Sequence, residues 1–235
     1  MEERIGGTYR MEIPGSQFSL STDSMVLADF AHARKGARIC DLGCGCGALG
    51  ILLLAKDPSL HITGIEIQPE AARFARENAA KNDLPQLEIL QGDLRECRAL
   101  LPANGFDAVV SNPPYYPAAS GALAQSASLA AARSEVLCTL PDLCHAAAWC
   151  LRFGGSFFLV HKPERLTDLL VHLREHKLEP KRLQFVRHSV ASQVCLVLIE
   201  ARLGAKPGVS LQQDLILFDA LGQPTGDYLR IYHQE

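Results

Sequence analysis

The stretch Asp41-Leu42-Gly43-Cys44-Gly45-Cys46-Gly47 ends one apolar segment, residues 37–42, and leads into another, residues 48–56. The first segment has the length of a buried strand, and the second has the length of a helix. The glycines between them allow a sharp turn and a close approach of a ligand to the main chain. The stretch therefore predicts a strand, a glycine-rich loop and a helix, the opening unit of an α/β fold.

The alternation of strands and helices continues along the chain. Further strands are expected at residues 61–67, 87–90, 107–110 and 156–161, and helices at residues 25–30, 69–82, 143–152 and 163–176. Strands that alternate with helices form a parallel sheet covered on both faces. Residues 182–186 and 193–201 leave no room for a helix between them, which predicts an antiparallel pair. We expect a seven-stranded, mostly parallel sheet with one antiparallel strand.

The 235 residues, 48% of them hydrophobic, are enough for one sizeable core, so we expect a single domain. An N-terminal arm and helix (residues 1–35) precede an α/β core (36–203) and a C-terminal extension (204–235) with a weak strand at 215–218. Gly154-Gly155 is expected to end the helix at 143–152, and residues 113–129 form a long irregular loop.

Charge and hydropathy exclude several classes of protein. The net charge of −3 is not that of a strongly basic chain, although local contacts with nucleic acid remain possible. The charged N-terminus has no apolar core of a signal peptide, and no apolar stretch has the length of a membrane span. We therefore expect a cytoplasmic protein without a membrane partner. Its eight cysteines lack Cys-x-x-Cys spacing, which favours reduced thiols and no metal site.

Asp41 distinguishes between two ligands of the glycine loop. The loop also matches the dinucleotide pattern, with glycines at positions 45, 47 and 50. In a dinucleotide site the glycines receive a pyrophosphate, which a neighbouring carboxylate would repel. S-adenosylmethionine has no phosphate, and its methionyl end carries an ammonium group. Asp41 can pair with that cation while Gly43, Gly45 and Gly47 let the backbone approach, which favours S-adenosylmethionine.

Acidic residues also follow the next two predicted strands. Glu66 ends the second strand, about 20 residues after the loop, where a carboxylate accepts hydrogen bonds from ribose hydroxyls. Its neighbour Ile67 is expected beside it in the cofactor site. Asp93 follows the third strand and could accept from the adenine amino group. These strand ends gather at the carboxyl edge of the sheet, where ligands bind in such folds.

The tetrapeptide Asn112-Pro113-Pro114-Tyr115 follows the fourth strand and is the predicted catalytic turn. An exocyclic amino nitrogen on a base is a weak nucleophile because its lone pair is delocalised into the ring. The Asn112 side-chain oxygen and the Pro113 carbonyl can accept its two protons, while Pro114 stiffens the turn. Tyr115 offers a face for stacking, worth roughly 1–3 kcal/mol per base. The turn alone could equally be a rigid surface feature.

With these residues in place, the chain resembles the class I S-adenosylmethionine-dependent methyltransferases, which have a Rossmann-like fold. More narrowly, it resembles the bacterial family that methylates N6 of adenosine 37 in a valine tRNA. The matching segments are Thr22-Asp23, the glycine loop, Glu66, Ser111-Asn112-Pro113-Pro114-Tyr115-Tyr116 and Ala132-Arg133-Ser134-Glu135. The resemblance implies cofactor contacts from Thr22 and Asp23, release of S-adenosylhomocysteine, and RNA contacts from Tyr116 and Arg133. It is weak from residue 204 onward.

Local charge agrees with an RNA partner. Residues 161–188 hold seven lysines and arginines against four acidic residues, a net +3, whereas residues 41–110 have a net charge of −4. Lys162 is the residue of the basic segment that we expect to contact the substrate. An ordinary solvated helix over residues 163–176 would have the same composition.

Other functions remain open at this point. The catalytic turn also suits methylation of adenine N6 or guanine N2 in ribosomal RNA, and methylation of a protein glutamine at N5. The last of these would be expected to need an additional N-terminal helical domain. A non-catalytic binding module and a dehydrogenase are the alternatives from other classes, and Asp41 argues against the dehydrogenase. The sequence indicates no obligate protein partner.

Overall fold

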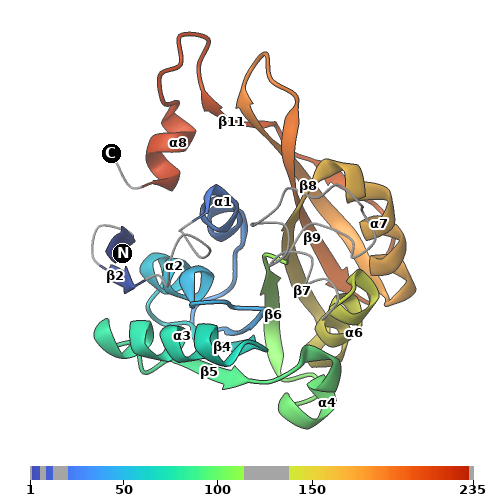
Figure 1. Ribbon diagram of the computed structural model, residues 1–235. Coiled ribbons are helices and arrows are strands. Elements are labelled where there is room, and N and C mark those ends of the chain that lie inside the picture. Colours follow the sequence, from blue (N-terminus) through green and yellow to red (C-terminus); the bar gives the residue numbers. More distant parts are fainter. Residues whose placement is uncertain (1, 6–8, 13–20, 114–137, 233–235) are drawn as a thin grey trace, which may run out of the picture.

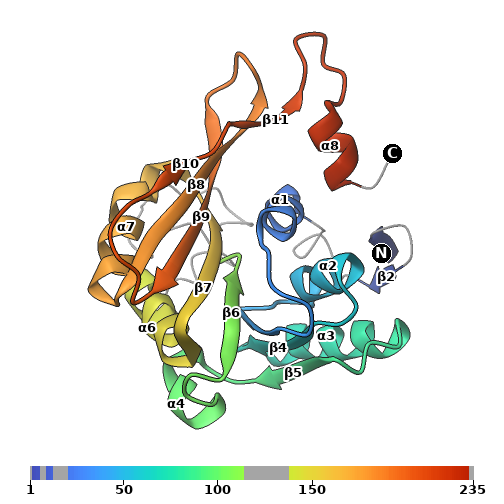
Figure 2. The ribbon, with the colours of Figure 1, turned by 180° about the vertical axis from the view of Figure 1, so that it is seen from behind.

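A mixed β-sheet with helices on both faces forms the centre of the computed structural model, which describes residues 2–5, 9–12, 21–113 and 138–232 (Figures 1 and 2). Seven main strands follow the order β5-β4-β3-β6-β7-β9-β8. Only β9 runs antiparallel to its neighbours in this order. The seven strands are β3 (Arg38–Leu42), β4 (His61–Glu66), β5 (Leu87–Gln91), β6 (Phe106–Ser111), β7 (Leu151–His161), β8 (Leu178–Ser189) and β9 (Val194–Leu203). The predicted α/β class and the single antiparallel strand are confirmed.

The strand count of seven was too low, because the C-terminal extension adds strands to the same sheet. β10 (Ser210–Leu211) and β11 (Leu215–Phe218) both pair in parallel with β8 and complete a nine-stranded sheet. β11 coincides with the weak strand expected at 215–218. β10 has only two residues, both exposed, so it has no burial pattern for a sequence to display.

Two groups of helices cover the two faces of the sheet (Figure 1). One group consists of α1 (Thr22–Phe30), α2 (Ala48–Lys56) and α3 (Pro69–Lys81). The other consists of α4 (Cys97–Leu100), α6 (Leu140–Cys150) and α7 (Leu166–Glu175). The short 3₁₀ helix η2 (Leu94–Glu96) directly precedes α4, and η3 (Pro163–Arg165) directly precedes α7. Each group packs against the sheet in its own hydrophobic cluster, and Leu27 and Ile51 belong to the first. The sheet is therefore buried on both faces, as parallel sheets require.

The predicted position of Gly154-Gly155 between a helix and a strand was wrong. α6 ends at Cys150 and β7 begins at Leu151, so the glycine pair lies inside β7. The pairing of β6 with β7 shifts here, from Phe106 opposite Leu151 to Ala108 opposite Ser156. The extra residues of β7 form a bulge, and Gly154 adopts a φ of 77°, which glycine accepts without strain.

The two ends of the described chain lie beside the face that carries α1, α2 and α3 (Figure 2). β1 (Glu2–Ile5) and β2 (Tyr9–Glu12) form a separate antiparallel pair, and β2 contacts α3. The C-terminal helix α8 (Gly226–Ile231) packs on α1, where Arg230 forms an ion pair with Asp29. Across the described ranges, every helix is too short or too polar to be a membrane-spanning segment.

Candidate active site

The carboxyl ends of β3, β4 and β6 carry the residues singled out from the sequence. Asp41 pairs in register with Gly64 of β4 on one side and with Val110 of β6 on the other. Glu66 is the last residue of β4, and Asn112 follows the last residue of β6. The parallel sheet therefore brings Asp41, Glu66 and Asn112 to the same edge, although 71 positions separate the first and last of them in the sequence.

The glycine loop is held to the end of β4 by backbone hydrogen bonds. The N–H groups of Gly43 and Cys44 both donate to the Ile65 carbonyl at 2.9 Å. Gly43, Gly45 and Gly47 have φ values of 77°, 55° and 88°, a region that other residues rarely adopt. Gly47 is also the N-cap of α2, so its turn directs the chain into that helix. All three predicted glycines therefore shape the loop that borders the site.

The buried carboxylate of Glu66 stabilises the same loop. Its oxygens accept hydrogen bonds from the backbone N–H of Gly45, at 2.9 Å, and of Gln68, at 2.8 Å. Burial raises the pKa of Glu66, and the N–H groups of Gln68, Gly45 and the half-buried Ile67 oppose that rise. Glu66 thus connects the end of β4 to the glycine loop. Its predicted contact with a ribose stays a prediction, as does the cofactor contact of Ile67.

Asp41 has a different environment from Glu66. Its side chain is only 1% exposed, and neither carboxylate oxygen has a hydrogen-bond partner within the described part of the chain. Burial, together with the nearby charge of Glu66, raises the pKa of Asp41 to about 7. A buried carboxylate without a partner is costly to a folded protein. A ligand cation at this position would remove that cost, so the residue fits the ammonium group of S-adenosylmethionine.

Asp93 follows β5, and its carboxylate forms an ion pair with the neighbouring Arg95. Its carboxylate accepts from the Arg95 side chain at 2.9 and 3.0 Å, and also from the Arg95 backbone N–H as the cap of η2. These hydrogen bonds to Arg95 lower the pKa of Asp93. The predicted contact between Asp93 and an adenine amino group therefore has to coexist with this pairing, and it stays a prediction.

The predicted catalytic turn begins in a fixed position. The buried Ser111 hydroxyl donates to the Leu42 carbonyl at 2.7 Å, which joins the end of β6 to the start of the glycine loop. The Asn112 side-chain N–H₂ donates to the Ser24 hydroxyl of α1 at 3.0 Å, and both Asn112 and Pro113 are half-buried. The remaining predicted residues of this region, Pro114, Tyr115, Tyr116 and Arg133, lie outside the described residues.

The start of α1 places Thr22 and Asp23 near the same edge. The Tyr232 hydroxyl donates to Thr22 Oγ1 at 2.9 Å, which connects the C-terminal extension to α1. Burial raises the pKa of the Cys195 thiol, Lys162 lowers it and Asp23 raises it, so both charged residues lie around Cys195 of β9. The predicted cofactor contact of Asp23 and the predicted substrate contact of Lys162 stay predictions.

The basic segment is less cationic in the fold than in the sequence. Its four arginines each form an ion pair with an acidic side chain: Arg165 with Asp168, Arg174 with Glu179, Arg182 with Glu200, and Arg187 with Asp214. The buried His161 next to Lys162 adds no charge near neutral pH, because burial and then Arg165 lower its pKa to about 4. Four of the seven cations of this segment are therefore paired with acidic side chains.

Sequence reasoning missed two residues that shape the site. The sequence did not single out Ser24, which contacts Asn112 from α1. Asn78 of α3 is fully buried, where it accepts from the Glu12 N–H at 2.8 Å and donates to the carbonyls of Glu12, at 3.0 Å, and Cys46, at 3.1 Å. A signal for Asn78 was present, because it continues the helical spacing of buried alanines at 71, 72, 75 and 79.

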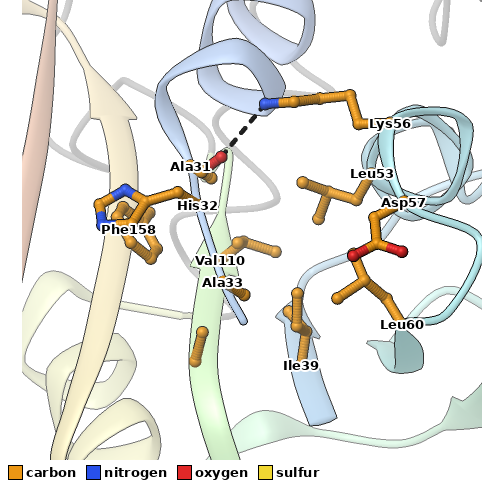
Figure 3. A pocket seen from close by; sticks show the side chains of 11 residues that line it. Ala31, His32, Ala33, Ile39, Leu53, Lys56, Asp57, Leu60, Val110 and Phe158 are labelled. Atoms are coloured by element: carbon orange, nitrogen blue, oxygen red, sulfur yellow. Dashed lines mark hydrogen bonds between the residues drawn. The ribbon is translucent and has the colours of Figure 1, made fainter. Parts of the chain in front are cut away.

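An apolar cavity of about 180 Å³ lies elsewhere, between the end of α1, α2 and the strands β3 and β6 (Figure 3). Its walls include Ile39, Leu53 and Phe158, and Lys56 beside it donates to the Ala31 carbonyl at 3.2 Å. None of the predicted site residues that the structure describes lines this cavity. Within the same described ranges, no three His, Cys, Asp or Glu side chains are grouped to hold a metal ion.

Comparison with known proteins identifies the family. Residues 16–176 match the model of the methyltransferase small domain. The chain belongs to the methyltransferase small domain family. This family consists of S-adenosylmethionine-dependent methyltransferases, and its match covers the glycine loop, Glu66 and the catalytic turn. The methyltransferase class that the sequence predicted is confirmed.

Full-length relatives and a solved structure agree with this assignment. A Porphyromonas gingivalis protein named tRNA1(Val) (adenine(37)-N6)-methyltransferase is 28% identical, over 95% of this chain and 90% of its own length. A Shewanella protein of the same name is 29% identical, over 87% and 86%. A crystal structure named as a predicted O-methyltransferase of Agrobacterium tumefaciens superposes with a TM-score of 0.74 at 21% identity, covering 90% of this chain and 96% of its own. This structure confirms the Rossmann-like fold of class I methyltransferases.

Proposed function

We propose that this protein transfers a methyl group from S-adenosylmethionine to N6 of an adenosine in a tRNA anticodon loop, namely adenosine 37 of a valine tRNA. The observation that carries the proposal is the placement of Asn112 at the end of β6, beside β3, at whose end the buried Asp41 lacks a partner among the described residues. The names of the two relatives that match most of the chain support this choice of substrate.

Asp41 and the glycine loop would hold the cofactor. Asp41 is nearly inaccessible and carries a raised pKa, so an ammonium group next to it would restore its ordinary ionisation. The glycines at 43, 45 and 47 let the main chain approach the ligand. Glu66, which accepts a hydrogen bond from Gly45 of the loop, would also accept from a ribose hydroxyl. Bound there, S-adenosylmethionine supplies an electrophilic methyl group on its sulfonium.

Asn112 and Pro113 would prepare the nucleophile. The Asn112 nitrogen donates to Ser24, which turns the amide oxygen away from Ser24, and this oxygen would accept from a substrate amino group. The carbonyl of Pro113 is a second acceptor, so both N–H protons of N6 can be bound. Two acceptors favour a pyramidal nitrogen whose lone pair is available. Catalysis then relies on positioning and fixed dipoles, and the excess proton can pass to water without a strong general base.

The RNA would approach from the side of α1 and β7. Lys162 directly follows β7, and α1 packs against β7. The target base has to leave its stack for its amino group to reach Asn112 and Pro113, and bases in single-stranded loops do so at low cost. A tRNA anticodon loop meets this requirement, which favours it over a base-paired segment of RNA.

Labelled product mapping tests the proposal. Purified protein is incubated with an unmodified valine tRNA transcript and S-adenosylmethionine carrying a labelled methyl group, and the digested RNA is analysed by mass spectrometry. We expect N6-methyladenosine at position 37 and none in a transcript with guanosine at that position.

Three outcomes would contradict the proposal. Label on a guanine, label only in ribosomal RNA, or label on a protein glutamine would each assign the activity to one of the alternative substrates. Valine tRNA from cells that lack the protein provides an independent check, because it should lack N6-methyladenosine at position 37.

A further inference from the structure

Two serines at the start of α1 contact the side chain of the predicted catalytic asparagine. Ser21 caps the helix by accepting from the Ser24 backbone N–H at 3.2 Å, and its hydroxyl donates to Ser24 Oγ at 3.3 Å. Asn112 Nδ2 donates to Ser24 Oγ at 3.0 Å and reaches Ser21 Oγ at 3.5 Å. Two serine hydroxyls at the start of α1 thus contact the nitrogen end of the Asn112 amide.

The contact shows which end of the amide faces α1. A side-chain amide has an acceptor oxygen and a donor nitrogen of similar size, and a rotation of 180° exchanges them. The proposed reaction needs the Asn112 oxygen, which can accept a hydrogen bond from the substrate amino group. The Asn112 nitrogen is itself a donor and could not accept one. Ser24 Oγ accepts from both Ser21 and Asn112, so the amide nitrogen is directed to α1 and the oxygen lies on the other side.

We propose that Ser24 is a positioning residue, which holds the Asn112 amide with its nitrogen on α1 and its oxygen toward the reacting amino group. This inference rests on the proposed function. Ser24 is 8% exposed and Asn112 is half-buried, so water competes poorly for the contact. Because Ser24 follows Thr22 and Asp23 in the first turn of α1, the same turn carries the predicted cofactor motif and the support of the catalytic turn.

A double-mutant cycle tests the inference. Ser24→Ala should lower kcat for tRNA methylation by about 5- to 10-fold, which is the effect of one hydrogen bond on the reacting geometry. KM for tRNA and Kd for S-adenosylmethionine should stay within about twofold, since Ser24 acts through Asn112. In an Asn112→Ala background, Ser24→Ala should cause no further loss of the residual rate. Ser24→Thr, which retains a hydroxyl, should recover most of kcat.

A matched control separates this effect from a general cost of losing a serine hydroxyl. Ser156→Ala removes the half-buried hydroxyl of Ser156, which donates to Glu200 at 3.1 Å on another part of the sheet, and kcat should stay near the wild-type value. A spectroscopic readout needs no substrate. In protein labelled with ¹⁵N-asparagine, the Asn112 side-chain signal, identified by its loss in Asn112→Ala, should shift in Ser24→Ala but not in Ser156→Ala.

The outcomes distinguish this inference from the proposed function. If wild-type protein methylates adenosine 37 while Ser24→Ala keeps full kcat and an unshifted Asn112 signal, the positioning role is wrong and the proposed function stands. Parallel losses of kcat and cofactor affinity in Ser24→Ala would assign Ser24 to the stability of α1 and would also overturn the role. If wild-type protein forms no N6-methyladenosine in tRNA, the proposed function fails and the inference fails with it.

Discussion

The ends of β3 and β6 lie side by side in the sheet, but their polar side chains differ in hydrogen bonding. At the end of β3, the Asp41 carboxylate is buried without a hydrogen-bond partner among the residues that the structure describes. At the end of β6, Ser111 donates to the Leu42 carbonyl at 2.7 Å and Asn112 donates to Ser24 at 3.0 Å. One strand end carries an unsatisfied charge, and the other carries polar groups that are already engaged.

The difference separates two ways of preparing a site. An unsatisfied buried carboxylate destabilises the empty protein and gains most when a cation binds, so it contributes to affinity for a ligand. A side chain that is already hydrogen-bonded gains little on binding, and its value lies in a geometry fixed before the reaction. We therefore expect changes at β3 to affect cofactor binding and changes at β6 to affect turnover.

The largest expected effect is that of Asn112→Ala. It removes the acceptor that would bind the substrate amino group, and loss of one such pre-organised partner costs on the order of 100-fold or more in kcat. Kd for S-adenosylmethionine, measured by calorimetry, should change little. A variant that retains full kcat, or that loses cofactor binding in the same proportion, would contradict the division between the two strand ends.

Asp41→Asn should have the next largest effect, which we expect on the affinity for S-adenosylmethionine and not on kcat. Replacing the carboxylate removes the charge that pairs with the methionyl ammonium, and we expect Kd for S-adenosylmethionine to rise by about 10- to 100-fold. At saturating cofactor, kcat should remain within a few-fold of the wild-type value. Unchanged affinity would show that the buried carboxylate serves the fold and not the ligand.

The pH dependence of stability gives a third, smaller signal. Asp41 has a folded pKa of about 7 against an ordinary value of 3.8, so between these pH values the folded state holds a proton that the unfolded state has lost. Stability of the cofactor-free protein should therefore fall as pH rises from about 4 to about 7, by up to about 1.4 kcal/mol per unit, and then level off. Urea titrations at several pH values, compared with Asp41→Asn, isolate this contribution, and identical slopes in the two proteins would refute it.

Tyr232→Phe should have the smallest effect. The substitution removes only the hydroxyl that donates to Thr22, while the stacking of Tyr232 on Tyr228, with ring centroids 4.2 Å apart, can persist. We expect the free energy of unfolding to fall by about 1 kcal/mol and kcat to stay within about twofold. A loss of kcat beyond tenfold would show that the C-terminal extension supports the end of β6 more directly than its contacts with α1 indicate.

The sequence predicted those parts of the site that depend on short stretches of chain. The glycine loop and the acidic residues at 41 and 66 follow their strands directly, so the order of elements places them at one sheet edge. The bond between Ser24 and Asn112 joins residues 88 positions apart, and it forms because α1 packs against α2 and β7. Asp93 illustrates a different limit, because its pairing with Arg95 is local but depends on a short 3₁₀ helix that has no periodicity to detect.

The fold was predictable for a similar reason. Buried strands and amphipathic helices leave strong patterns, which is why the strands from β3 to β9 and the helices α2, α3, α6 and α7 were found, whereas the four-residue α4 was not. The two-residue β10 and the six-residue α8 are too short to show such a pattern, and their positions depend on contacts with β8 and α1. The bulge at Gly154-Gly155 was missed because a glycine pair ends a helix as readily as it interrupts a strand.

Asn78 has a consequence for the cooperativity of the molecule. Its amide is bonded at once to Glu12 of β2 and to the Cys46 carbonyl in the glycine loop, from a position inside α3. Releasing β2 would remove the two hydrogen bonds between this buried amide and Glu12, so we expect the opening of the strand to be coupled to that of the loop. Ligand binding at the loop should therefore slow hydrogen exchange at the amides of Arg10 and Glu12, which hydrogen-bond to Asn82 and Asn78.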